Sequence, residues 1–110
     1  MIVGDLLLVM NQEKYYGPPM SRATTKAVFS VQVTNVVGGS VALAVKIETR
    51  NEDDTTWSEA GALTSIIAAG DQSKVISGLK ELVRYTYQFT AGSAADGMYV
   101  ISAAPQWLND

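Results

Sequence analysis

Cysteine and histidine are both absent from the 110 residues of this chain. Without cysteine there is no disulfide, no thiolate nucleophile and no cysteine-based zinc site. Without histidine the chain lacks the usual general base and the commonest metal ligand, so neither a Ser-His-Asp nor a Cys-His arrangement can form. The two absences favour a protein that is not an enzyme and that uses no cofactor.

Charge is also scarce, because charged residues make up 17% of the chain and sum to a net charge of −3. The eight Lys and Arg residues are scattered singly, so no basic stripe exists to neutralise phosphates. We therefore expect neither nucleic acid nor an anionic membrane as a partner. A surface with little charge and many small residues instead suits burial against other protein.

The beginning of the chain lacks the features of a secretory leader. Its first ten residues, MIVGDLLLVM, contain no basic residue and are interrupted by Asp5. The run is also shorter than the ~20 apolar residues that a membrane-spanning helix needs. We expect synthesis in the cytoplasm without a signal peptide.

The chain is organised around the stretch from Ser40 to Trp57. Here apolar residues alternate with smaller or polar ones, the pattern of a half-buried strand; the apolar set is Val41, Leu43, Val45 and Ile47. A preceding stretch alternates in the same way, with Ala27, Phe29, Val31 and Val33 on one face. Because Gly38-Gly39 lies between the two, the sequence predicts a hairpin over Thr25 to Arg50.

Further strands follow from similar patterns, and they are predicted over Ile2–Met10, Leu63–Ala68, Ser73–Ser77, Leu82–Ala91 and Met98–Ala104. A break is predicted at Ala60-Gly61. Residues 72–84 also allow a helix, since their apolar residues recur at helical spacing, but Gly78 favours two strands. The count predicts an all-β fold: a single antiparallel β-sandwich of seven or eight strands, jelly-roll-like, that forms one domain over residues 1–110.

Three readings apply to the polar turn after the central strand and to the tryptophan that follows it. Asn51, Asp53 and Asp54 offer the hard oxygen ligands of a calcium site, although the spacing matches no EF-hand and also suits a solvated turn. Trp57 and Trp107 offer aromatic faces for stacking a sugar, or for packing in a core or interface. The carboxylates could also serve glycoside hydrolysis; they belong to Glu48, Glu52, Asp53 and Asp54.

The same stretch carries a family resemblance. The alternating strand, followed by Thr49, Arg50, Asn51, Asp53, Asp54 and Trp57, resembles the "strand, S/T-x-(N/D)-(D/G)-x-x-W" pattern of small β-sandwich modules in phage virion proteins. A later element of that pattern corresponds here to Leu82-Val83-Arg84-Tyr85. The resemblance covers roughly Val41 to Val100, and Asp53-Asp54 replaces the usual Asp-Gly of the turn. It implies a capsid, decoration, tail or fibre part, or a sugar-binding domain, and a location in a virion or particle.

These observations lead us to expect a non-enzymatic structural protein that self-assembles into a symmetric oligomer, as a phage-type virion or shell subunit. Its partners would be copies of itself and other virion or shell proteins. Residues 1–24 read as a strand and an extended loop, an arm that could contact a neighbour. The predicted contact residues are Ile2, Leu6, Leu8, Tyr15, Tyr16 and Trp107. The alternative is a carbohydrate-binding module that uses Trp57 and the Asn51–Asp54 turn.

Overall fold

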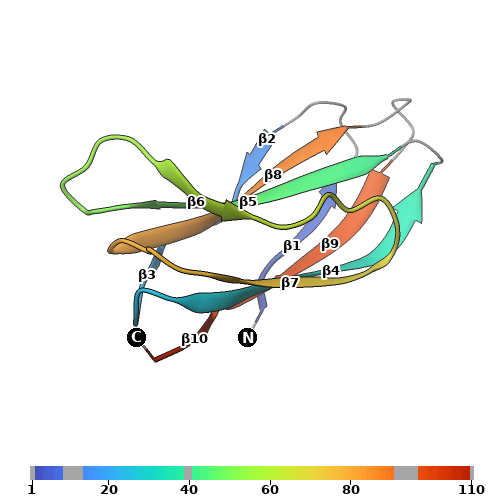
Figure 1. Cartoon of the computed structure of the whole chain (residues 1–110). Helices are drawn as coiled ribbons and strands as arrows, with labels where there is room; N and C mark the ends of the chain where they lie inside the picture. The colour runs from blue at the N-terminus through green and yellow to red at the C-terminus, as the bar shows by residue number, and fades with distance from the viewer. Residues whose placement is uncertain (1, 9–13, 39–40, 91–96, 110) are drawn as a thin grey trace.

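The computed structural model describes residues 2–8, 14–38, 41–90 and 97–109, and these residues contain strands and no helix (Figure 1). The strands are β1 (Ile2–Leu8), β2 (Lys14–Tyr16), β3 (Met20–Ser21), β4 (Ala27–Val37), β5 (Ala42–Arg50), β6 (Ser58–Ala62), β7 (Gly70–Ile76), β8 (Leu82–Thr90), β9 (Gly97–Ala103) and β10 (Gln106–Trp107). Within this part of the chain there is no helix long and apolar enough to cross a membrane.

The strands form two antiparallel sheets of five strands each. In sheet A the order is β1-β9-β4-β7, and the short β10 pairs with the beginning of β4. In sheet B the order is β2-β8-β5-β6, and β3 pairs with the beginning of β8. Figure 1 shows the two sheets stacked face to face. The prediction of an all-β antiparallel sandwich is confirmed.

The order of the strands is that of a jelly roll, in which a long antiparallel hairpin is rolled into two sheets. The early strands pair with the late ones, β1 with β9 and β2 with β8, and the middle strands close the series, β4 with β7 and β5 with β6. Successive pairs alternate between sheet A and sheet B. Eight strands thus carry the topology, and the short β3 and β10 each pair with an inner strand, β8 and β4.

The core lies between the sheets and is built from the apolar faces that the sequence predicted. Phe29 and Val31 of β4 face Leu43 and Val45 of β5, and all four are at most 1% exposed. Strand β8 contributes a row of aromatic residues to the core, and Val83 precedes them on the same face. The aromatic residues are at most 2% exposed, and they are Tyr85, Tyr87 and Phe89. Burying each such side chain stabilises the fold by roughly 1.5–3 kcal/mol.

The predicted hairpin over Thr25 to Arg50 is wrong. Strand β4 pairs with β7, β9 and β10, whereas β5 pairs with β6 and β8, so the connection around Gly38 passes from one sheet to the other. Gly38 has a φ of 109°, a conformation that glycine adopts without steric cost. The two strands point their apolar faces at each other across the core, and this produces the same alternation in the sequence as pairing would.

Two further predictions around β6 and β7 need correction. Leu63–Ala68 is a loop with a single bridge between Ile66 and Leu43, and it is not a strand. The predicted break at Ala60-Gly61 lies inside β6. A Cβ on Gly61 would come within 3.1 Å of the Ile76 side chain, so the glycine allows β6 to approach β7 across the sandwich. The preference for strands over a helix in residues 72–84 is confirmed by β7 and β8.

Candidate functional site

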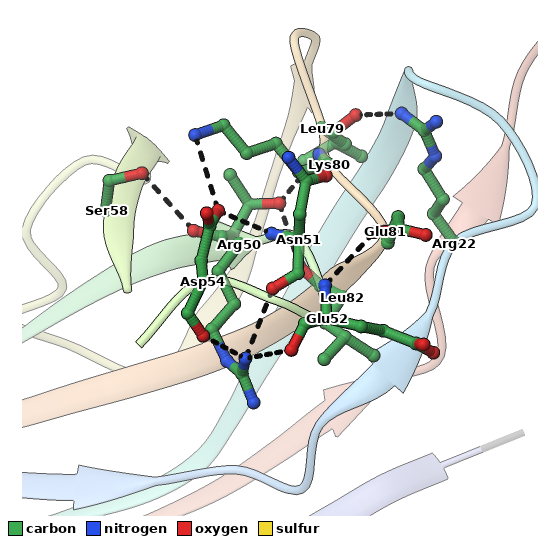
Figure 2. Close-up of polar contacts among 11 residues, drawn as sticks. Arg22, Arg50, Asn51, Glu52, Asp54, Ser58, Leu79, Lys80, Glu81 and Leu82 are labelled. Atoms are coloured by element: carbon green, nitrogen blue, oxygen red, sulfur yellow. Dashed lines mark hydrogen bonds and ion pairs between the residues drawn. The ribbon is translucent and has the colours of Figure 1, made fainter. Parts of the chain in front are cut away.

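One end of the sandwich carries a network of charged and polar side chains around the turn after β5 (Figure 2). Arg50, the last residue of β5, curls over this turn, and its Nη1 donates to the carbonyls of Asn51, Glu52 and Asp54 at 3.2, 3.2 and 2.6 Å. A single guanidinium group thus satisfies three carbonyls that no strand could pair. The turn is fixed by its own chain.

The Asp54 carboxylate is engaged within the same turn. It accepts a hydrogen bond from the backbone N–H of Asn51 at 2.8 Å and lies 4.0 Å from the Lys80 ammonium group. The described residues contain no group of three or more acidic side chains arranged to hold a metal ion. The calcium site predicted at Asn51, Asp53 and Asp54 therefore gains no support from the geometry, which gives Asp54 partners of its own.

Three segments are joined at this end, which we call the charged end: residues 17–26, 51–57 and 77–81. Thr49, on β5 just before the second segment, links that strand to the third, because its hydroxyl donates to the Leu82 carbonyl and accepts from the Lys80 N–H, both at 2.8 Å. The N–H of Glu52 donates to the Glu81 carboxylate at 3.0 Å. Arg22 donates to the Leu79 carbonyl and so ties in the first segment (Figure 2).

The two parts of the sequence pattern after β5 and in β8 meet on the outer face of sheet B. The Arg84 guanidinium lies 4.3 Å from the ring centre of Trp57 and 4.3 Å from that of Tyr16. It also pairs with Glu48, the residue opposite it on β5, at 2.7 Å. Arg50 covers Trp57 as well, at 5.0 Å. Cation–π contacts of this kind stabilise by about 0.5–2 kcal/mol each.

This stack bears on two of the expected activities. A sugar at Trp57 would compete with the guanidinium groups of Arg50 and Arg84 for the indole ring. Glu48, proposed as one carboxylate of a hydrolase, is held by Arg84 in an ion pair whose side chains are 17% and 18% exposed. The ion pair and the cation–π contacts together join β5, β8 and Trp57 on this face of the sheet.

The predicted contact residues have different placements. Tyr15 and Trp107 are partly buried and pack against the core of their own chain. Tyr16 remains 55% exposed beside Arg84. The backbone of β1 pairs with β9 at the edge of sheet A. Three of the predicted contact residues belong to β1: Ile2, Leu6 and Leu8. Their side chains lie outside the described part of the structure.

Two buried tyrosines on β8, Tyr85 and Tyr87, connect the two sheets through their hydroxyl groups. The Tyr85 hydroxyl accepts from the Ser30 N–H at 3.2 Å and donates to the Ala103 carbonyl at 2.8 Å. The Tyr87 hydroxyl shares a hydrogen bond with the Ser102 hydroxyl. Burial raises the pKa of Tyr87 to about 12, against the opposing effect of the Ser102 bond, and it raises the pKa of Tyr85 as well. Both therefore act as neutral hydrogen-bonding groups at physiological pH.

The described residues at the opposite end of the sandwich include 36–38, 63–70 and 97–99, and we call these three segments the uncharged end. These segments contain no charged residue. They carry three of the five large apolar side chains that are exposed in the described structure: Ile67 at 70%, Tyr99 at 46% and Val37 at 45%. Ala68 and Ala69 are exposed beside Ile67. In Figure 1 the two ends lie at opposite tips of the strands.

Comparison of the chain with protein-family models, with curated proteins and with solved structures found no match. The fold and the two ends are therefore the observations from which a function can be argued.

Proposed function

We propose that this protein is a non-enzymatic structural subunit that associates with copies of itself into a symmetric oligomer or particle, of the kind found in phage virions. The observation that carries the proposal is the exposed apolar surface of the uncharged end. Cores of protein interfaces are depleted in charge and enriched in aromatic and apolar groups, and this surface has that composition. Jelly rolls build many capsid shells, which supports the proposal by analogy of fold alone.

The uncharged end also gives the contact a location different from the predicted N-terminal arm. Strand β1 already has a pairing partner in its own sheet, β9, over residues 2–8. This pairing occupies one side of the β1 backbone, and the other side is an edge of sheet A. In the segment 63–70, Ile66 pairs with Leu43 and is 3% exposed, whereas the neighbouring Ile67 is 70% exposed and offers an apolar side chain to a partner.

The test compares two variants that place the same charge on two exposed β-branched residues. Ile67→Lys alters the uncharged end, whereas Val75→Lys alters β7, where Val75 is 53% exposed and pairs with Val28. Both proteins should fold, as judged by circular dichroism. We expect light scattering behind a sizing column to give a discrete multi-subunit mass for the wild type and for Val75→Lys, and a monomer near 11.8 kDa for Ile67→Lys. A monomeric wild type would refute the proposal, and an unchanged assembly of Ile67→Lys would refute the location.

A further inference from the structure

The outer face of sheet A contains a hollow of about 430 Å³ that the assembly proposal does not use. Three adjacent strands line it, β7, β4 and β9. Asp71, Gln32 and Ile101 form one row across these strands, since Gln32 is opposite Asp71 on one side and opposite Ile101 on the other. Ser73 and Ser30 form part of the next row, and Ala103 completes the lining there.

The spacing of a β-sheet fixes the dimensions of this surface. Neighbouring strands are about 4.8 Å apart and alternate residues on a strand about 7 Å apart, so the two rows cover a patch of roughly 10 by 7 Å. On β4, the side chains of Phe29, Val31 and Val33 are buried in the core, and the residues between them point outward. The same alternation that builds the core therefore places Ser30 and Gln32 on the hollow.

The polar groups of the hollow are available for a ligand. Within the described residues, no hydrogen bond or ion pair involves the side chains of Gln32, Asp71 or Ser73, and Ser30 makes contacts through its backbone alone. The neighbouring Lys74 is directed elsewhere, because its ammonium group donates to the Ala62 carbonyl at 3.1 Å. A carboxylate, an amide and two hydroxyls thus converge on one side of an apolar strip formed by Ile101 and Ala103.

This combination selects a class of ligand. A carboxylate accepts from hydroxyl groups, an amide both donates and accepts, and a serine hydroxyl does either. The apolar strip suits the C–H face of a ring. No basic side chain lines the hollow, and Asp71 repels anions, so phosphorylated, sulfated and acidic ligands are disfavoured. A purely apolar ligand would leave the amide and the carboxylate desolvated without partners.

We propose that the outer face of sheet A binds a neutral saccharide, with Asp71 and Gln32 as the principal hydrogen-bonding residues and Ile101 as the apolar floor. This site lies on the sheet opposite to Trp57, and it is independent of the self-association at the uncharged end. The sandwich would then present one surface to copies of itself and another to a glycan.

The experiment is a glycan array followed by NMR titration of the 15N-labelled full chain with the best neutral glycan. We expect amide shifts confined to residues 30–32, 71–73 and 101–103, and at least a tenfold weaker binding for Asp71→Asn and for Gln32→Ala. Asp53→Asn is the matched control, since it removes one exposed carboxylate at the charged end, and it should bind as the wild type does.

Three results would overturn this inference. They are no binding of any neutral glycan, a preference for acidic glycans, and binding that survives both Asp71→Asn and Gln32→Ala. Trp57→Ala is included because loss of binding in that variant alone would place the sugar on sheet B. The oligomer mass of each variant is measured in parallel, so a failure of self-association is recognised separately from a failure to bind sugar.

Discussion

The described residues at the two ends of this sandwich differ in how their side chains are used. At the charged end, hydrogen bonds made by Arg22, Glu52 and Lys80 join three segments within the chain. At the uncharged end, Ile67 and Val37 remain exposed, and the described segments carry no charge. Loops whose polar groups are hydrogen-bonded within the chain need no further partner. Exposed apolar side chains, in contrast, are stabilised when another surface buries them. Under the proposed self-association, this difference assigns the neighbour to the uncharged end.

The comparison of the two ends applies to the folded sandwich. Alkaline pH is expected to destabilise that fold more than any other change. Burial raises the pKa of Tyr87 from 10.0 to about 12. Between these values the unfolded chain has lost the phenolic proton that the folded chain retains, so the free energy of unfolding falls as the pH rises. Its contribution is fully present below pH 10, and a two-unit shift corresponds to roughly 3 kcal/mol. The raised pKa of Tyr85 acts in the same direction.

Urea unfolding followed at a series of pH values between 10 and 12 measures this loss. Tyr87→Phe isolates the contribution of this tyrosine. The variant should be less stable at neutral pH, because Ser102 loses its partner, and its stability should fall less steeply above pH 10. Tyr99→Phe, at an exposed position, should reproduce the wild-type slope. Equal slopes for Tyr87→Phe and the wild type would contradict the assignment.

The next largest expected effect is a loss of stability. It is measured by making the same Thr→Val substitution at each end. Thr49→Val keeps the shape of the side chain and removes a hydroxyl that serves two backbone groups while being 3% exposed. Leaving the Lys80 N–H and the Leu82 carbonyl without partners should lower the free energy of unfolding by about 2 kcal/mol. Thr64→Val, at the exposed loop of the uncharged end, should stay within about 0.5 kcal/mol of the wild type. Chemical denaturation compares the two, and similar losses would mean that both ends are equally fixed.

The sequence predicted the layers of this fold better than its connections. Alternation identified the buried faces of β4, β5 and β8, because each of those strands has one face in the core. It could not identify partners, since β4 and β5 alternate identically whether they pair or oppose each other across the sandwich. The predicted break at Gly61 was wrong for a similar reason. The glycine lies inside β6 because Ile76 approaches it closely, and the sequence does not reveal that contact.

The candidate site shows the same limit. The sequence singled out the Asn51–Asp54 turn and Trp57, but it could not reveal that Arg50 and Arg84 would occupy both. The hollow on sheet A combines residues from β4, β7 and β9, which are far apart in the chain. No local spacing indicates such a site, because it depends on register across three strands.

The smallest expected effect is that of salt on the assembled protein, and it distinguishes the two ends directly. Raising ionic strength from about 0.1 M to about 1 M shortens the screening length from about 10 Å to about 3 Å, which weakens contacts between exposed charges. An interface at the uncharged end contains apolar side chains, whose burial does not depend on this screening. We therefore expect the mass measured by light scattering to stay constant across this range. An interface built from Asp53, Lys80 and Glu81 would dissociate instead, and that result would assign the neighbour to the charged end.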